Sequence, residues 1–540
     1  MPLLRCADAA ARTEDRTRPD CRQWQAKGRA RSFLRNAGLH KGDRCALLTP
    51  NSIQWAALDL AIMAEGGIVV PLYSRQAPGE LVSMIQDSAP ALLIGGDAKL
   101  LGEIAPLLSS GAAAPRMVLV DEVLGATTEE KTAPCSLSDA DTVTIIYTSG
   151  TSGEPKGVML TTRNVNHMLR CTGSRLDLLM GQHEDTEKVF HYLPFCFAGS
   201  WILLLSCLSR NSLLTLSTDL NKLTNEMRLA APEYFLNVPI LLERMRAKIE
   251  DQMEQRGGPL LILFRRARQC WMARHNGGAA GGGLWPRMSL MLAQKLLFPS
   301  IRRKVGANLR ALICGSAALS KETQLFFMML GIPILQVYGL TETTAICTMD
   351  YPHKIAPGRV GPAIDGIEMM VGENDEVLAR GPHIFAGYWN RPEATAHAMR
   401  DHWFHTGDQG TVDASGNWNI TGRLKNLIVL ASGHNVAPEP IEEKLQRAIP
   451  GVQQVVLLGH GRSYLTALFT GNVQRADVNH ALAEMNAPQP HYKRIHAYTV
   501  SDEPFTIENG MLTANGKLKR DAIAERHGDT IEALYQKQEA

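Results

Sequence analysis

The chain has 540 residues, of which 45% are hydrophobic and 20% charged, and this length exceeds what one hydrophobic core supports, so we expect at least two domains. Its 56 Lys and Arg residues nearly balance its 54 Asp and Glu residues, so the charge gives no sign of a nucleic-acid partner. The ten cysteines form no Cys-x-x-Cys pair, and no apolar stretch is long enough for a signal peptide or a membrane span. We therefore expect a cytoplasmic protein with reduced thiols, and peripheral contact with the inner face of a membrane stays open.

Short apolar segments alternate with helical ones along much of the chain. Strands are expected at residues 42–48, 67–72, 91–94, 309–314 and 334–338, and helices at 55–64 and 321–330. This alternation is typical of α/β proteins with a doubly wound, largely parallel sheet. Between the two series, residues 241–271 are basic and helical in pattern, and the glycine-rich residues 275–283 that follow predict a mobile surface loop.

The segment 147–157 is rich in Gly, Ser and Thr and lies between expected strands at 142–147 and 156–160. Its glycines allow backbone N–H groups to converge on an anion, its hydroxyls add donors and its lysine adds a positive charge. These residues are Thr148, Ser149, Gly150, Thr151, Ser152, Gly153, Lys156 and Gly157. The spacing is not that of a Walker A P-loop. A phosphate-binding loop of another kind is favoured over the alternative, a polar turn between two strands.

Four further segments follow in order and carry groups suited to a nucleotide site. They are Gly315-Ser316-Ala317-Ala318, Tyr338-Gly339-Leu340-Thr341-Glu342, Thr406-Gly407-Asp408 with Gly422-Arg423, and residues 513–520 with Lys517. Short strands and turns are expected at about 355–420, and the pattern becomes compact α+β after Lys425. We therefore expect one domain at residues 1–424 and a second at 425–540.

In this order and spacing, the five motifs resemble those of the adenylate-forming superfamily of acyl- and aryl-CoA synthetases, luciferases and peptide-synthetase adenylation domains. The closer resemblance is to bacterial long-chain fatty acyl-CoA synthetases, and it rests on residues 238–243, 436–442 and 508–513 and on the basic helical insert. The resemblance implies an α/β fold with a large N-terminal domain of doubly wound mixed sheets and a smaller β subdomain. It also implies a small mobile α+β C-terminal domain that carries the catalytic lysine.

The resemblance assigns a role to each motif, and each role has a plainer structural alternative. Residues 315–317 and Gly339 would cradle adenine, with Tyr338 on its other face, although 315–318 could be a simple strand-to-helix turn. Thr341 would bind phosphate, and Glu342 and Thr151 would be catalytic Mg²⁺ ligands. An acid at the start of a helix also explains Glu342.

The remaining roles involve the ribose, the α-phosphate and the second domain. Asp408 and Arg423 would bind ribose or phosphate, unless Thr-Gly-Asp is a common turn. Lys517 would stabilise the charge that develops at the α-phosphate, although it could be a solvated lysine. Lys425 would be the hinge and Gly433 would line the pantetheine tunnel, unless they belong to a turn and a strand end.

The chain departs from the family pattern at the predicted acyl pocket. Phe197 stands where many relatives place a histidine, which favours a more apolar pocket wall. Ala198, Gly199 and Trp201 are further candidates for this wall, and a purely structural role stays open for all of them.

These observations predict an acid–thiol ligase, a long-chain fatty acid–CoA ligase that uses Mg²⁺, with ATP and CoA as co-substrates. A carboxylate and ATP would give acyl-AMP and pyrophosphate, and CoA would then give acyl-CoA and AMP. Two alternatives stay open: an enzyme that loads an acyl carrier protein, and a non-catalytic relative that binds a nucleotide or a lipid.

Overall fold

The computed structural model describes residues 3–6, 22–108, 114–149, 155–181, 185–275, 284–513 and 516–536. The predicted mobile loop at 275–283 lies outside the described residues, apart from His275, which ends helix α11 (Gly258–His275).

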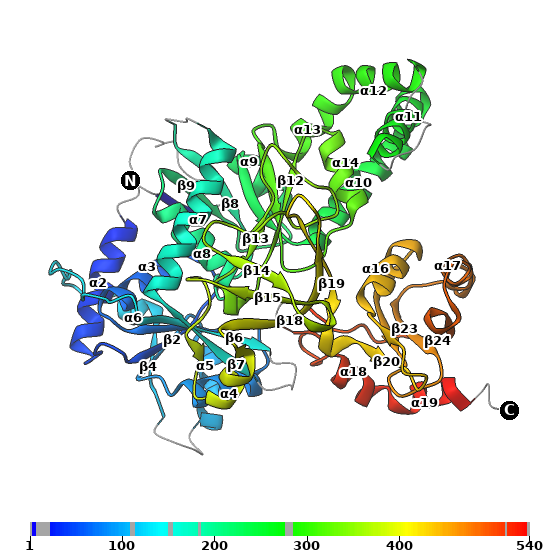
Figure 1. Cartoon of the computed structure of the whole chain (residues 1–540). Coiled ribbons are helices and arrows are strands. Elements are labelled where there is room, and N and C mark those ends of the chain that lie inside the picture. Colours follow the sequence, from blue (N-terminus) through cyan, green and yellow to red (C-terminus); the bar gives the residue numbers. More distant parts are fainter. Residues whose placement is uncertain are drawn as a thin grey trace.

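Two seven-stranded sheets form most of the large domain (Figure 1). The first has the spatial order β16 (Gly387–Tyr388), β7 (Pro155–Thr161), β6 (Thr142–Ser149), β3 (Ile68–Pro71), β2 (Arg44–Leu48), β4 (Leu92–Gly95) and β5 (Arg116–Leu119). The second has the order β1 (Leu3–Cys6), β9 (Ser212–Leu216), β8 (Glu187–His191), β10 (Tyr234–Asn237), β11 (Ala311–Cys314), β12 (Ile334–Tyr338) and β13 (Thr348–Met349). Neighbouring strands are parallel, except that β7 is antiparallel to both its neighbours and β13 is antiparallel to β12.

Helices pack on these sheets, and their buried apolar side chains fall into three clusters, one of which joins both sheets. The helices are α2 (Arg22–Asn36), α3 (Ile53–Ala64), α4 (Pro78–Ser88), α5 (Ala98–Leu108), α6 (Val120–Leu124), α7 (Thr162–Met180), α8 (Ala198–Leu208), α9 (Leu223–Ala230) and α14 (Lys321–Met329). The largest cluster of buried apolar side chains joins α3, α7 and α8 to strands of both sheets, such as β2 and β9. Thr161 caps α7, because its hydroxyl accepts a hydrogen bond from the Asn164 N–H at 3.3 Å.

A third, antiparallel sheet forms the β subdomain. It contains β14 (Glu368–Val371), β15 (Glu376–Arg380), β18 (Trp403–Val412), β17 (Met399–Arg400) and β19 (Trp418–Arg423), with η3 (Glu373–Asp375) and α15 (Pro392–Ala398) beside them. Its last strand leads into η4 (Leu424–Asn426), which spans the predicted domain boundary.

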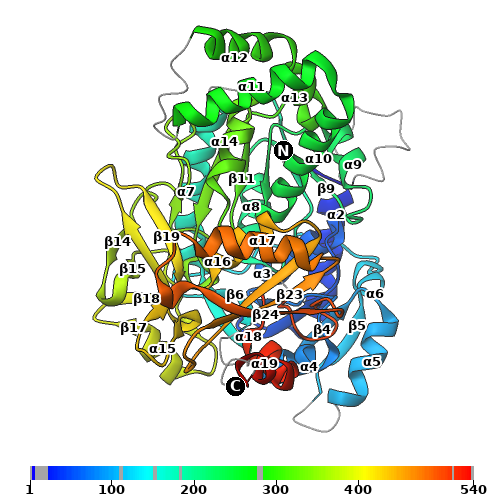
Figure 2. The ribbon, with the colours of Figure 1, turned by 90° about the vertical axis from the view of Figure 1, so that its right-hand side faces the viewer.

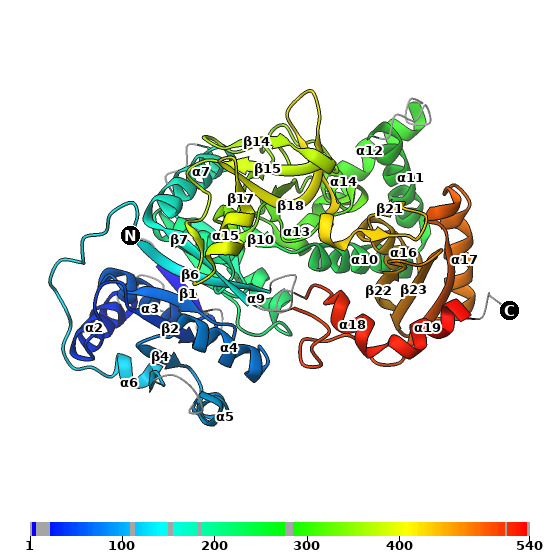
Figure 3. The same cartoon turned by 60° about the horizontal axis from the view of Figure 1, so that its bottom comes forward.

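The small domain has its own sheet and its own apolar core. Its elements are β20 (Ile428–Val429), β21 (Asn435–Val436), α16 (Glu439–Ala448), β22 (Val452–Leu458), β23 (Leu465–Gly471), α17 (Arg475–Asn486), η5 (His491–Lys493), β24 (Ile495–Ser501), α18 (Arg520–Arg526) and α19 (Gly528–Gln536). Leu445, Phe469 and Val478 are fully buried in its core. The small domain lies against the large domain (Figure 3), where Lys519 forms an ion pair with Glu80.

The basic segment predicted as one helical stretch forms two helices, α10 (Pro239–Arg256) and α11. Gly257 and Gly258 have φ values of +59° and +62°, a left-handed conformation that ends a helix, and Pro259 suits the first turn of the next one. Two further helices follow, α12 (Leu284–Leu296) and α13 (Phe298–Gly306), and the group projects from the body of the large domain (Figures 1 and 2).

The fold class predicted from the sequence is confirmed: a large domain of mixed sheets, a smaller β subdomain and a small α+β domain. No helix in the described part of the chain is both long enough and apolar enough to span a membrane.

Candidate active site

A cavity of about 1020 Å³ lies where the two domains meet, and segments far apart in the sequence line it. Its walls come from the ends of β6 and β7, the loops after β11 and β12, the start of α8, the end of β19 and the small-domain loop that carries Lys517. Because β11 and β12 are parallel neighbours, their carboxyl ends open at the same edge of the sheet, where open α/β sheets bind ligands. The cavity is large enough for a ligand the size of a nucleotide.

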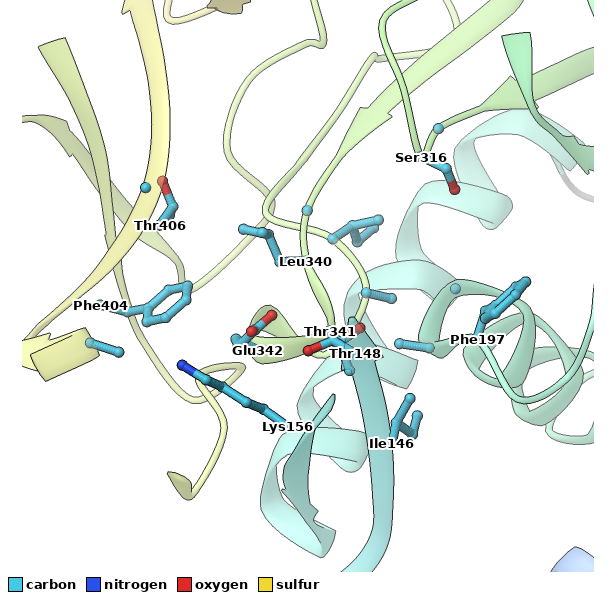
Figure 4. A pocket seen from close by; sticks show the side chains of 18 of the residues that line it. Ile146, Thr148, Lys156, Phe197, Ser316, Leu340, Thr341, Glu342, Phe404 and Thr406 are labelled. Carbon is cyan, nitrogen blue, oxygen red and sulfur yellow. The ribbon is translucent and has the colours of Figure 1, made fainter. Parts of the chain in front are cut away.

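Thirteen of the predicted site residues line this cavity. They are Thr148, Lys156, Phe197, Ala198, Gly199, Gly315, Ser316, Gly339, Thr341, Glu342, Arg423, Lys425 and Lys517. Figure 4 shows Thr148, Lys156, Thr341 and Glu342 close together, with Phe197 and Ser316 on the opposite side. The predicted residues Gly150, Thr151, Ser152 and Gly153 lie outside the described residues, and Ser149 is described only as the last residue of β6.

The backbone at the strand ends comes too close to its neighbours for side chains. A Cβ added to Gly339 would lie 2.2 Å from the Ala345 carbonyl oxygen, and one on Gly315 would lie 2.6 Å from Val337 Cγ2. Ser316 adopts φ +72°, a left-handed conformation that costs free energy for a residue with a side chain. The loop therefore holds a strained conformation where it faces the cavity.

Glu342 is held by a tyrosine that the sequence analysis missed. The Tyr388 hydroxyl donates to Glu342 Oε1 at 2.9 Å, and the Tyr388 ring centroid lies 5.3 Å from Lys156 Nζ. Tyr388 thus fixes the predicted metal ligand and the predicted phosphate-binding lysine relative to each other. It comes from the two-residue strand β16, in a run of short strands where nothing in the local sequence marks it.

Six Lys and Arg residues line the cavity: Lys156, Arg400, Arg423, Lys425, Lys517 and Lys519, the last of which forms an ion pair with Glu80. Lys156, Arg423, Lys425 and Lys517 form one group, because their charges act on one another. Burial lowers the pKa of Lys425, and the charges of Lys156 and Arg423 lower it further. Burial also lowers the pKa of Lys517, as does Arg423, whereas Asp408 and Glu342 act in the opposite direction. The like charges of this group repel one another, so this part of the cavity favours a ligand that carries several negative charges.

Asp408 and Tyr338 lie behind the cavity wall instead of on it. The Tyr338 hydroxyl donates to Asp408 Oδ2 at 2.9 Å, and Arg423 Nε lies 2.7 Å from Asp408 Oδ1. Burial raises the pKa of Asp408, and Arg423 opposes this rise. In the structure Asp408 orients the Arg423 side chain. The predicted contact of Asp408 with ribose would require Asp408 and Arg423 to rearrange.

Three other predicted residues also lie off the cavity wall. The Trp201 side chain is 1% exposed, and its indole N–H donates to Asp59 Oδ2 at 3.0 Å in the core. Its assignment to the pocket wall is therefore wrong for this structure, because Trp201 lies on the side of α8 that faces away from the cavity. Ala317 is exposed beside Ser316, and Gly433 lies in an exposed turn of the small domain with φ +80°.

The opposite end of the cavity is apolar. Its wall is formed by Phe197, Ala198, Gly199, Ile202 and Leu203 of α8 and its N-cap, with Leu176 of α7, Leu236 of β10 and Ile313 of β11. The Phe197 ring packs 5.9 Å from the ring of Tyr73, and both side chains line the cavity. Ile202, Leu203 and Leu176 were not predicted from the sequence, because only the completed fold places α7 beside α8.

The large α/β domain and the small α+β domain, which meet at one cavity, have the architecture of adenylate-forming enzymes. The chain matches the family model of the AMP-binding enzymes over residues 24–389, and that of the AMP-binding enzyme C-terminal domain over residues 425–539. The chain therefore belongs to the AMP-binding enzyme family, and the predicted resemblance is confirmed.

Curated relatives and solved structures of this family resemble the chain over most of its length. It is 28% identical to the long-chain-fatty-acid–CoA ligase FadD15 of Mycobacterium bovis, over 94% of this chain and 90% of that protein. It is 25% identical to the chloroplastic long-chain-fatty-acid–[acyl-carrier-protein] ligase AEE15 of Arabidopsis thaliana, over 93% of this chain and 80% of that protein. The fold matches that of O-succinylbenzoate coenzyme A synthetase of Bacillus subtilis in complex with ATP and magnesium ion, with a TM-score of 0.73, 19% identity, and coverage of 96% of both chains.

Proposed function

We propose that this protein is an ATP-dependent fatty acid–CoA ligase that works through an acyl-adenylate. In the first step a carboxylate oxygen of the fatty acid attacks the α-phosphorus of ATP, and the bond to the β-phosphate breaks to release pyrophosphate. In the second step the CoA sulfur attacks the acyl carbonyl carbon, and AMP leaves. This is the activity predicted from the sequence, and the curated relative FadD15, named as a long-chain-fatty-acid–CoA ligase, supports it.

The observation that carries this proposal is the pairing of opposite environments in one cavity. One end holds Glu342 and the group of Lys156, Arg423, Lys425 and Lys517, and the other end is lined by apolar side chains of α7 and α8. A polyphosphate suits the first end, since it relieves the repulsion between the cations. An alkyl chain suits the second end, since each buried methylene stabilises the complex by about 0.8 kcal/mol. A reaction between ATP and a fatty acid places both kinds of group within one site.

Catalysis in the first step follows from positioned charge. We propose that Lys156 binds the β- and γ-phosphates, and that Lys517 and Arg423 stabilise the charge that develops at the α-phosphate. No protein nucleophile is required, because the cavity aligns the two substrates for direct attack. The adenine ring is proposed to lie against the backbone of the loop at Ser316, which lines the cavity.

The residues on the cavity wall fit Mg²⁺ that arrives with ATP. Among the described residues, no group of three or more His, Cys, Asp or Glu side chains could hold a metal ion. Mg²⁺ is usually bound by one or two carboxylates together with substrate phosphates, and Glu342, oriented by Tyr388, supplies one such carboxylate. Thr151 is the second predicted ligand and lies outside the described residues. When bound, the ion would neutralise charge on the phosphates.

The second step is proposed to use another arrangement of the two domains. In the structure Lys517 of the small domain lines the cavity, which is the arrangement that the first step needs. Rotation at Lys425, in the connection η4, would withdraw Lys517 and bring the turn with Gly433 toward the cavity. The lack of a side chain at Gly433 would then allow the pantetheine arm to pass close to the backbone.

A comparison of two thiol acceptors distinguishes the proposal from its two alternatives. Purified protein, ATP and palmitate are incubated with CoA or with a phosphopantetheine-bearing acyl carrier protein, and the thioester products are measured. The proposal predicts palmitoyl-CoA. If the thioester forms only on the carrier protein, then the carrier protein, and not CoA, is the acyl acceptor. A protein that binds ATP and releases no pyrophosphate with any fatty acid would be a non-catalytic relative.

A further inference from the structure

The four helices after β10 include a segment with an unusual charge. We call residues 258–306, which contain α11, α12 and α13, the helical arm; it projects from the large domain in all three ribbon views (Figures 1, 2 and 3). The arm contains nine Lys and Arg residues and no Asp or Glu, although these charges nearly balance in the whole chain. Its cations are Arg265, Arg266, Arg268, Arg274, Arg287, Lys295, Arg302, Arg303 and Lys304.

Helix α12 also exposes an apolar face. Five large apolar side chains on its outer side are exposed: Trp285, Met288, Met291, Leu292 and Leu296. Their spacing of mostly three and four residues places them along one side of the helix. They are five of the sixteen large apolar side chains that are exposed in the described part of the chain, so they form a concentrated patch, as at surfaces that meet a partner. Trp285 is 78% exposed and Leu296 is 67% exposed.

The opposite side of α12 already has its partners. Leu290, Ala293 and Leu297 are buried in the core that α12 shares with α11, α13 and α14. The outer face is therefore not required to hold the arm on the protein.

The cations nearest the outer face are not neutralised by the protein. On the side toward α10, Arg265 pairs with Glu254 and Arg268 pairs with Glu250. Arg287 and Lys295 lie on α12 itself, and within the described residues neither has a carboxylate partner. Long cationic side chains beside an apolar face can keep their charges at the level of lipid headgroups while their stems cover apolar surface.

We infer that the outer face of α12 docks on an anionic membrane surface, with Trp285 and Leu296 in the boundary between headgroups and acyl chains. An anionic lipid surface complements both the positive charge and the apolar side chains, and an indole ring suits that boundary. A second copy of the chain is a poorer occupant, because two arms packed face to face would bring eighteen cations together without an acid from either arm. This docking goes beyond the proposed reaction and does not depend on it.

Vesicle flotation tests this inference with the full chain. Vesicles of phosphatidylcholine alone are compared with vesicles of equal parts phosphatidylcholine and phosphatidylglycerol. The protein should float with the anionic vesicles, and added salt should weaken the binding because it screens the charges. Replacing Arg287 and Lys295 together by Gln should weaken binding by roughly 25-fold, since each cation near an anionic surface contributes roughly fivefold.

The apolar face is tested by the double variant Trp285→Ser and Leu296→Ser. Binding should fall by at least roughly tenfold, because two large side chains no longer enter the lipid boundary. The matched control is Leu229→Ser on α9, which removes an apolar side chain that is 63% exposed and should bind as the unmodified protein does. Thermal unfolding of each variant checks that it folds.

Quenching by brominated lipids provides a second readout that needs no double variant. Trp fluorescence of the unmodified protein should be quenched by brominated anionic vesicles, and Trp285→Phe should remove most of that quenching. The inference is overturned if the protein does not float with anionic vesicles, or if the α12 variants float as well as the control. Equal binding to uncharged vesicles, or a dimer that the α12 variants dissociate, would also overturn it.

Discussion

Replacing Lys517 by Ala separates the two proposed half-reactions. Lys517 reaches the cavity from the small domain and lies in the field of Glu342 and Asp408. The substitution removes one of the six Lys and Arg residues that line the cavity, and Lys156, Arg423 and Lys425 of the same group remain. ATP should therefore still bind, whereas the charge that develops at the α-phosphate loses one of its two proposed donors.

The expected loss is large in one half-reaction and small in the other. Removing one positioned charge-stabilising donor costs about 100- to 1000-fold in rate, or about 2.7 to 4 kcal/mol. Pyrophosphate release from ATP and palmitate should fall by this factor. Transfer from chemically prepared palmitoyl-AMP to CoA should stay mostly intact, because Lys517 is proposed to leave the cavity for that step.

The matched control is Lys444→Ala, which removes an exposed lysine from α16 of the same domain and should change neither half-reaction. Normal consumption of ATP and palmitate by the Lys517 variant would refute its assignment. Equal losses in both half-reactions would refute the proposal that Lys517 leaves the cavity for the second step.

Three further predictions concern binding, chain length and stability. Asp408→Ala should weaken ATP binding in calorimetry by roughly 1 to 3 kcal/mol, because Arg423 loses the carboxylate that orients it; unchanged affinity would remove Asp408 from the site. Gly199→Phe should favour short over long fatty acids in a kinetic comparison, because a Cβ there meets nothing closer than Leu236 Cδ2 at 3.8 Å and the ring would fill the acyl end of the cavity; an unchanged preference for palmitate would place the chain elsewhere. Burial raises the pKa of Asp59 to about 7. The free energy of unfolding should therefore be highest below about pH 4, where Asp59 is protonated in both states, and should fall by at most about 4 kcal/mol as the pH rises through 7. Urea unfolding of Asp59→Asn should not show this fall, and parallel pH profiles for the two proteins would refute the prediction.

The α/β architecture could be predicted because its signals are local. Apolar strands of four to seven residues, such as β2 and β12, alternate with helices along the chain. The break between α10 and α11 could also have been predicted, since Gly257, Gly258 and Pro259 together end one helix and begin another.

The site could be predicted only as far as its motifs reach. Gly315, Gly339 and Glu342 follow strand ends and carry their signal in the sequence. Tyr388 carries none, because its role depends on the pairing of β16 with β7, which lies more than two hundred residues earlier in the chain.

Trp201 shows a different kind of failure. The residues Ala198, Gly199, Ile202 and Leu203 share one side of α8 and line the cavity, and a helix of 3.6 residues per turn then places residue 201 on another side. The helical period would have excluded Trp201 once the start of α8 was known. Its pairing with Asp59 depends on the packing of α8 against α3 and could not be predicted from either segment alone.

The central claim is that one cavity couples ATP to a fatty acid, and pyrophosphate release across a panel of carboxylates tests it most directly. The panel contains acetate, benzoate and the even-numbered fatty acids from octanoate to palmitate, each with and without CoA. We predict ATP-dependent pyrophosphate release whose catalytic efficiency rises several-fold per added carbon until the apolar end of the cavity is filled, since each buried methylene contributes about 0.8 kcal/mol. CoA should increase turnover by removing the acyl-adenylate. Maximal efficiency with acetate or benzoate, and none with octanoate through palmitate, would contradict the account.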